Sequence, residues 1–294
     1  MALQFNDPSM NIGTYVTFPE EGTGKNIDQM SKLLADNRHP LTFAGSMKLK
    51  LRALDLYASV LENPTKYTLE YKVEVTKFFK DVWSNYIDTG DAIFLHPGRR
   101  ARINLVNPQN ARDSEFLKLF DPKNKEKLKQ GAIVLPDGMY DSEIGIREFN
   151  AAEMETFTNK HYAGEKGVLE NRIWKVLARN PSEVPRELAE DSELLKTFTK
   201  AVNYLSVFTF GYTENMGVDT AYPQDVETGR LWFAGRLWGR SGAYGRDHWD
   251  PTDGRLVGVA LDAPRLVVPS YGRLEEIIAK LTPHQVEIKQ LLVP

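Results

Sequence analysis

The sequence contains no cysteine among its 294 residues. This absence excludes disulfide bonds, thiolate nucleophiles, iron–sulfur clusters and every zinc site with a cysteine ligand. A metal site would have to be assembled from carboxylates and the five histidines, which are scattered along the chain. We therefore expect neither a metal ion nor another cofactor.

Long apolar runs are also missing. The longest nearly apolar stretch, Ala201–Tyr212, is too short and too polar to cross a bilayer, which takes about 20 apolar residues. The N-terminal sequence has neither the basic segment nor the apolar core of a signal peptide. We expect no membrane association and a cytoplasmic location, or one inside a virion-like particle.

Local catalytic motifs are absent as well: the sequence has no G-x-S-x-G elbow, no dinucleotide-binding glycine fingerprint and no H-E-x-x-H. Its one His-x-Asp, at His248 and Asp250, would supply two ligands of a mononuclear iron site, but His284 is the only later histidine. The sequence from Asp250 to Gly254 is typical of a β-turn, which is the competing interpretation. Whether the protein is an enzyme stays open.

The overall composition is that of an ordinary globular protein, with 41% hydrophobic and 26% charged residues. Lysine and arginine number 37, aspartate and glutamate 40, and the net charge is −3. This balance excludes a uniformly basic nucleic-acid-binding protein, but it is compatible with a local basic patch.

Hydrophobic periodicity predicts several helices. These are expected over residues 26–36, 46–62 with Ser46 as the cap, 68–86, most of 151–207 with Ser192 as a cap, and 274–281 after Ser270. Alternating polar and apolar residues predict strands. These are expected over residues 100–105, 132–135, two short stretches within 255–268, and 286–293 at the end of the chain.

The segment 92–106 is predicted to form a hairpin near residue 95, with a turn at His96–Arg99 in which Gly98 supplies a positive φ. The sum is an α+β protein: helices dominate the first two thirds and β-structure the last third. We divide the chain into an extended arm (1–25), a mainly helical region with the hairpin (26–210) and a β-rich region with a C-terminal helix and strand (211–294). One continuous domain is equally compatible with the sequence.

The composition changes after Gly211. No lysine occurs between Ala201 and Ala279, whereas seven arginines do. Between Arg230 and Arg240 arginine and tryptophan recur at alternate positions, which predicts a strand with one cationic, indole-bearing face. A helix is disfavoured here because the glycines of this segment would each cost about 1 kcal/mol relative to alanine. Residues 241–246 are expected to form a glycine-rich loop.

A second arginine cluster lies between Ala92 and Arg112, a stretch with no acidic residue. In the predicted strand, Arg100, Arg102 and Asn104 share the outer face. If both arginine strands belong to one sheet, they would build a groove. Guanidinium groups bind phosphate or carboxylate and aromatic rings stack on bases. The candidate polyanion-binding residues are Arg99, Arg100, Arg102, Arg230, Trp232, Arg236, Trp238, Arg240, Tyr244 and Arg246.

Three interpretations remain. The arginine–tryptophan pattern is purely structural if arginine stems cover the indoles and pair with acids such as Asp225, Glu227, Asp247 or Asp250. It is functional if the protein is a non-enzymatic subunit of an assembly, with protein subunits and single-stranded nucleic acid or another polyanion as partners. The alternative function is an enzyme whose arginines hold an anionic small molecule.

Overall fold

The computed structural model describes residues 12–16, 26–129, 132–142, 147–150, 152–153, 160–162, 164–211, 216–220, 225–235, 237, 241–245, 254–260 and 268–293. It combines helices with a mixed β-sheet, with helices towards the N-terminal side of the chain and strands towards the C-terminal side. The predicted α+β class is confirmed.

The α-helices have well-defined bounds in the described residues. They are α1 (Asn26–Ala35), α2 (Phe43–Glu62), α3 (Leu69–Ser84), α4 (Glu115–Lys118), α5 (Met139–Ser142), α7 (Gly164–Glu170), α8 (Arg172–Leu177), α9 (Leu194–Phe210), α10 (Tyr271–Leu281) and α11 (Gln285–Leu292). Short 3-10 turns cover Pro108–Asp113, Pro122–Lys127 and Thr282–His284.

The described strands lie between Ile12 and Ala260. They are β1 (Ile12–Val16), β2 (Arg38–Pro40), β3 (Tyr86–His96), β4 (Arg100–Asn104), β5 (Leu128–Lys129), β6 (Ala132–Val134), β7 (Arg147–Phe149), β8 (Lys160–Tyr162), β9 (Met216–Thr220), β10 (Thr228–Ala234), β11 (Ser241–Gly245) and β12 (Gly254–Ala260).

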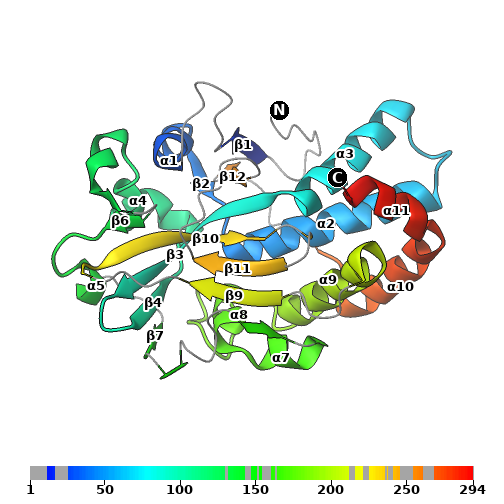
Figure 1. Ribbon diagram of the computed structural model, residues 1–294. Helices are drawn as coiled ribbons and strands as arrows, with labels where there is room; N and C mark the ends of the chain where they lie inside the picture. Colours follow the sequence, from blue (N-terminus) through cyan, green and yellow to red (C-terminus); the bar gives the residue numbers. More distant parts are fainter. Residues whose placement is uncertain are drawn as a thin grey trace.

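One sheet joins these strands in the order β1-β12-β3-β10-β11-β9-β8, with β2, β4, β6 and β7 paired beside this path and β5 paired with β6. Most pairs are antiparallel, while β12 runs parallel to β3 and β11 runs parallel to β9. The strands β3, β10, β11 and β9 lie side by side through the centre of Figure 1. The predicted hairpin near residue 95 is confirmed, because β3 pairs antiparallel with β4.

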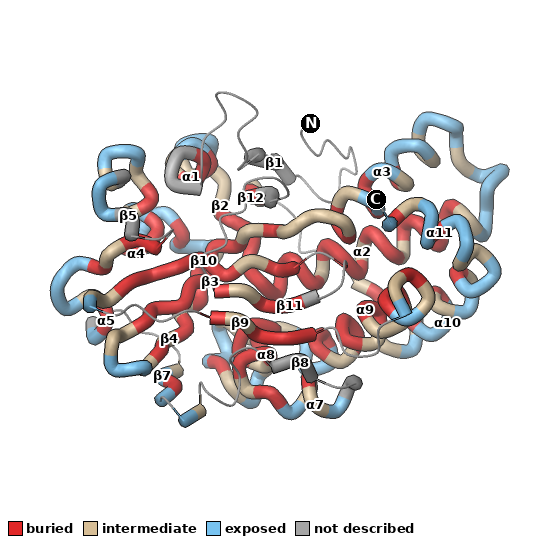
Figure 2. Tube along the Cα trace, in the orientation of Figure 1, coloured by how far each residue is buried: buried red, intermediate tan, exposed pale blue. Residues whose placement is uncertain are grey.

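The hydrophobic core connects the sheet to the long helices. One buried cluster runs from Leu41 to Leu292 and contains residues of α2, α3, α8, α9, α10, α11 and the central strands. A second, smaller cluster includes Phe94, Phe116 and Leu231 and lies with α1, α4 and β6. Figure 2 shows the central strands and much of α2 buried, whereas the outer parts of α3, α10 and α11 are exposed.

Helix starts follow local capping chemistry. Thr42 caps α2 by accepting a hydrogen bond from the Gly45 amide, and Thr68 and Ser270 cap α3 and α10 in the same way. The predicted cap Ser46 lies inside α2, where its hydroxyl donates to the Phe43 carbonyl at 2.6 Å. The predicted cap Ser192 is also wrong, because α9 begins after Glu193 without a side-chain cap.

Three further predictions are corrected. Residues 286–292 belong to α11 and do not form a strand, and Val293 is the C-cap of this helix. Buried Ile288 and Leu292 are four residues apart and so share one helix face. Residues 241–245 form β11 and not a loop. In the β3–β4 turn the positive φ, 58°, belongs to Arg99 and not to Gly98. The Gly98 amide instead donates to His96 Nδ1 at 2.8 Å.

Candidate functional site

The arginine–tryptophan segment begins as a strand, as predicted. β10 lies between β3 and β11, with Ala234 opposite both Ile87 and Ala243. Gly229 in this strand faces the Phe116 ring, where a Cβ atom would lie 2.3 Å from the ring edge. Glycine is therefore required at this position by close packing and not by a turn.

The predicted outward orientation of Arg230 and Trp232 is wrong. Trp232 is fully buried in the core cluster, and only 5% of Arg230 is exposed. Burial lowers the pKa of Arg230 to about 10. The alternation in the sequence correctly predicted which side chains share a face of this strand. Both faces of the sheet are covered here by helices and other segments, however, so Leu231 on the opposite face is buried too.

An aromatic cluster of Tyr86, Phe233 and Tyr244 lies beside these buried residues. The Phe233 and Tyr244 rings stack with centroids 5.0 Å apart, and Tyr86 meets them edge-on at 5.4 and 6.3 Å. The three side chains come from β10, β11 and β3, and each is partly exposed. Aromatic rings held in this way by three neighbouring strands form a rigid, partly accessible surface.

Cross-strand pairing extends this cluster into a row. Asp88 of β3 lies opposite Phe233, Phe233 lies opposite Tyr244, and Tyr244 lies opposite Asp219 of β9. Residues directly opposite one another in paired strands share a face of the sheet. The row therefore places two aromatic rings between two carboxylates, both of them on partly exposed residues.

The Arg100–Arg102 region has a different arrangement. The expected alternation is confirmed, since Arg100, Arg102 and Asn104 are partly exposed while Ala101 and Ile103 are buried. Glu148 of β7 lies 3.3 Å from Arg102 and 3.7 Å from Arg100.

Tyr140 lies under both guanidinium groups, at 5.3 and 5.5 Å from its ring centroid, and its carbonyl accepts a hydrogen bond from Arg102 at 2.8 Å. Burial, the largest effect, raises the pKa of the Tyr140 phenol. The acid that pairs with these two arginines is thus Glu148. Glu227, one of the acids considered as a partner for the arginine–tryptophan segment, lies 3.5 Å from His96.

The two arginine strands do not build a common groove from Arg102 and Arg230. They do belong to one sheet, with β3 between them. Arg102 lies opposite Phe94, which lies opposite Gly229, so Arg102 and Gly229 share a face. Arg230 is the next residue along β10 and its side chain therefore points to the other face.

Four predicted binding residues, Arg236, Trp238, Arg240 and Arg246, lie outside the described residues, as do His248 and Asp250. In the chain, Arg236, Trp238 and Arg240 belong to the connection between β10 and β11, and Arg246 directly follows β11. Of the predicted residues, the structure therefore places Tyr244 in the aromatic cluster, and it places Arg100 and Arg102 around Tyr140. No described contact joins the aromatic cluster to the residues around Tyr140.

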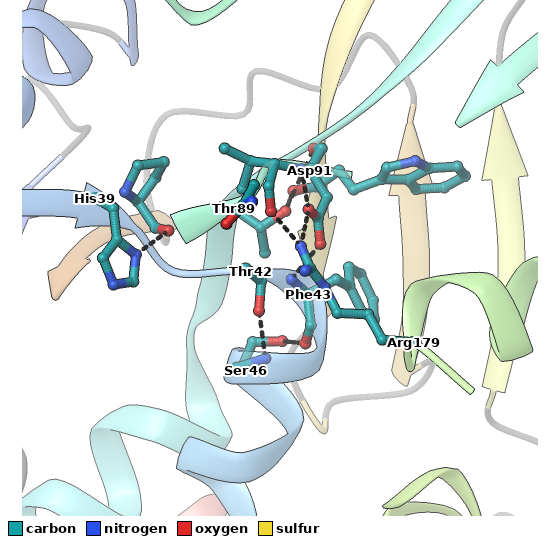
Figure 3. Close-up of polar contacts among 12 residues, drawn as sticks. His39, Thr42, Phe43, Ser46, Thr89, Asp91 and Arg179 are labelled. Atoms are coloured by element: carbon teal, nitrogen blue, oxygen red, sulfur yellow. Dashed lines mark hydrogen bonds and ion pairs between the residues drawn. The ribbon is translucent and has the colours of Figure 1, made fainter. Parts of the chain in front are cut away.

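A buried ion pair was not identified from the sequence. Asp91 of β3 is fully buried and accepts hydrogen bonds from the Phe43 amide at 2.7 Å, the Val106 amide at 2.9 Å and Arg179 at 2.9 Å (Figure 3). Arg179 also donates to the Val106 carbonyl at 2.6 Å. These hydrogen bonds connect β3 to the first turn of α2, to the segment after β4 and to Arg179, which lies two residues after the end of α8.

The surroundings of this ion pair are also polar. Thr89 donates to the Trp232 carbonyl at 2.7 Å, which links the pair's strand to β10. His39 lies nearby in Figure 3 and its Nδ1 donates to the Pro40 carbonyl at 3.1 Å. Burial lowers the pKa of His39. The hydrogen bond to the Pro40 carbonyl raises this pKa in part, and the positive charge of Arg179 lowers it further.

Lys50 is the other charged residue in the core that the sequence analysis missed. It is 1% exposed, and its Nζ donates to the Val82 carbonyl at 2.7 Å. A sequence signal was available: Lys50 is three residues after Met47 and four before Leu54, so it occupies the apolar face of α2. A lysine at such a position is expected to be buried.

The described part of the chain offers neither a metal site nor a membrane-spanning helix. No group of three or more histidine, aspartate or glutamate side chains there could hold a metal ion. Among the helices described, none has the length and apolarity needed to cross a membrane.

No protein-family model matches the chain, and no curated protein matches it in sequence. One solved structure is similar, described as "Accommodation of massive sequence variation in Nanoarchaeota by the C-type lectin fold". The alignment covers 87% of this chain and 100% of that chain, with a TM-score of 0.48 and 13% identity. A likeness at this level assigns no family to the chain and carries no argument about its ligand.

Proposed function

We propose that this chain is a non-catalytic subunit of an assembly that binds a single-stranded polyanion at the aromatic cluster of Tyr86, Phe233 and Tyr244. The observation that carries the proposal is the stacked pair Phe233–Tyr244, with Tyr86 against both rings, on a partly exposed part of the sheet. Arg236, the first arginine of the connection between β10 and β11, is three residues after Phe233, and Arg246 is two residues after Tyr244.

The chemistry of the cluster fits nucleobases in particular. Aromatic side chains stack on bases and contribute roughly 1–3 kcal/mol per base, while arginines bind the phosphates. The carboxylates of Asp88 and Asp219 lie at the two ends of the row of stacked rings. We assign the bases to the aromatic rings and the phosphates to Arg236, Arg240 and Arg246.

Residues with buried side chains are left out of the proposed contacts. Arg230 and Trp232 are assigned a supporting role beneath the cluster, because neither side chain is accessible. Arg102 donates hydrogen bonds to Glu148 and to the Tyr140 carbonyl, and it is also assigned a supporting role. The proposed contacts are Tyr86, Phe233, Arg236, Trp238, Arg240, Tyr244 and Arg246.

Fluorescence anisotropy with a labelled oligothymidylate tests the aromatic part of this proposal. Phe233→Ala combined with Tyr244→Ala should weaken binding by about tenfold or more, since each lost stacking contact is worth roughly 1–3 kcal/mol. The matched control is Tyr67→Ala with Tyr71→Ala, which removes a second stacked pair whose ring centroids are also 5.0 Å apart. Equal loss in both double variants would contradict the proposal.

The arginine part is tested by salt dependence. Arg236→Ala with Arg240→Ala should reduce the slope of log Kd against log salt by about one per phosphate contact removed. Arg186→Ala, an exposed arginine on another part of the surface, is the control and should leave the slope unchanged. Native mass spectrometry tests the assembly clause, and a monomer at micromolar concentration that also fails to bind the oligonucleotide would overturn the proposed function.

A further inference from the structure

The solvent side of α3 carries two exposed apolar side chains. Leu69 is 68% exposed and Val73 is 59% exposed, and they are four residues apart on this helix. Residues with this spacing share one helix face. The opposite side of α3 is buried in the core through Val75, Phe78, Phe79, Val82 and Trp83. Leu69 and Val73 therefore form an apolar strip that points away from the core of this chain.

The charged residues beside this strip change sign along the helix. Glu70 and Glu74 are exposed in the N-terminal half of α3, and Lys77 and Lys80 are exposed in its C-terminal half. Glu70 and Lys77 are two helical turns apart, which is about 10.5 Å along the axis and too far for an ion pair within one helix. The exposed side of α3 thus has an acidic end, a basic end and the apolar strip beside its acidic half.

A second copy of the same helix complements this pattern when it runs antiparallel. Two identical helices packed in this way across a two-fold axis place the first half of each against the second half of the other. With the axis beside Val73, halfway between Glu70 and Lys77, each Glu70 lies opposite Lys77 of the other copy, and the two apolar strips meet. A parallel arrangement would instead place Glu70 against Glu70.

We propose that two copies of this chain associate through the exposed side of α3, with Leu69 and Val73 at the centre of the contact and Glu70 paired with Lys77 across it. The proposal names the partner for the assembly clause of the proposed function and rests on it to that extent. Tyr86 of the aromatic cluster lies beyond the other end of α3. The cluster is therefore outside the proposed contact, and dimerisation and oligonucleotide binding are measured separately.

Sedimentation velocity at micromolar protein concentration and low ionic strength tests the charge pattern. The wild type should dimerise. Glu70→Lys alone and Lys77→Glu alone should each raise the dimer dissociation constant by about tenfold or more, because the two-fold axis places the like-charge contact in the interface twice. An equimolar mixture of the two variants should dimerise again, since each copy then carries the charges that complement the other.

The matched control uses two exposed residues of α4, which is far from α3 in Figure 1. Glu115→Lys and Lys118→Glu should dimerise like the wild type, both alone and mixed. Circular dichroism checks that every variant keeps its helix content, which we expect because all four positions are exposed.

Cysteine crosslinking tests the position of the two-fold axis. The chain contains no cysteine, so Val73→Cys introduces a single thiol next to the proposed axis. Mild oxidation should convert this variant to a covalent dimer, because a disulfide needs its two Cα atoms within about 7 Å. Glu115→Cys, which places the thiol on α4, should stay mainly monomeric under the same conditions.

The outcomes separate this proposal from the proposed function. The α3 dimer is wrong if the wild type stays monomeric, if the single charge variants dimerise like the wild type, or if mixing them restores nothing. Equal crosslinking at positions 73 and 115 also overturns it. If one of these results is found and the labelled oligothymidylate still binds, the binding clause of the proposed function stands. If the dimer behaves as expected and no oligonucleotide binds, that clause fails and the α3 dimer stands.

Discussion

Two arginine–carboxylate sites of this protein differ mainly in their access to water. Arg179 and Asp91 have side chains that are 3% and 0% exposed, whereas Arg102 and Glu148 have side chains that are 24% and 37% exposed. In the buried site the carboxylate also accepts two backbone amides, and it thereby connects three separate segments. In the outer site, the contacts described for the Glu148 carboxylate are with the side chains of Arg100, Arg102 and Tyr140, and the carboxylate is partly exposed to solvent. The same chemical pair therefore has a structural role in the buried site, whereas in the outer site it stays hydrated.

Removing the buried carboxylate should have the largest effect. Asp91→Ala leaves the Arg179 charge buried and two backbone amides without an acceptor, so we expect a loss of about 3–5 kcal/mol in the free energy of unfolding. Urea denaturation followed by circular dichroism measures it. The exposed acid Asp113 provides the control, and Asp113→Ala should change stability by less than about 0.5 kcal/mol. A small loss for Asp91→Ala would show that this site tolerates an unpaired charge.

Lys50 differs from both sites because it is buried with a backbone carbonyl, and no carboxylate, among its described contacts. Its pKa in the folded state is about 7, below the value of about 10.4 in an unfolded chain. The unfolded state therefore binds the proton between these values, and stability should rise by about 2 kcal/mol between pH 7 and pH 9 and stay flat below pH 7 as far as this group is concerned. Lys50→Met should remove this rise, which denaturation at several pH values would measure. An unchanged rise in the variant would assign it to another group.

The outer site should respond weakly. Glu148→Gln removes the charge that faces Arg100 and Arg102, and partly exposed ion pairs contribute roughly 0–1 kcal/mol. The same denaturation measurement checks this. A loss approaching that of Asp91→Ala would contradict this expectation, because it would give the outer site a structural role despite its contact with water.

The smallest effect is expected in the β3–β4 turn. Arg99 and Arg179 have nearly the same positive φ, 58° and 56°. Glycine adopts this conformation without the steric cost of a side chain, so Arg99→Gly should stabilise the protein by up to about 1 kcal/mol. Arg179→Gly should be destabilising, because it relieves the same strain but removes the partner of Asp91. Thermal unfolding of both variants gives the sign, and a shift of the same sign in both would contradict this explanation.

The sequence was most informative where a local pattern decides the structure. The helices α2, α3, α9 and α10, the β3–β4 hairpin and the strand β10 follow from periodicity, and the capping residues Thr68 and Ser270 mark the starts of α3 and α10. The last segment was misassigned because its alternating valine and isoleucine residues fit a strand, while its buried residues, four apart, fit a helix. Short apolar stretches are ambiguous between the two periods.

The site was less predictable. Tyr244 was identified, but its partners Phe233 and Tyr86 were not, since Tyr86 is more than 140 residues away in sequence and meets Tyr244 only through the order β3-β10-β11. The inward orientation of Arg230 and Trp232 could not be read from the strand either. Alternation specifies two faces, and it does not specify that both faces are covered.

By itself, the sequence determined the fold class, most helices, the strand character of the arginine–tryptophan segment and the absence of any cysteine chemistry, because each depends on neighbours within a few residues. Only the tertiary structure decided which arginines are buried, that Asp91 and Arg179 meet, and that Lys50 contacts the end of α3. These outcomes depend on which distant segments pack against each side chain, and strand order and helix placement fix that packing.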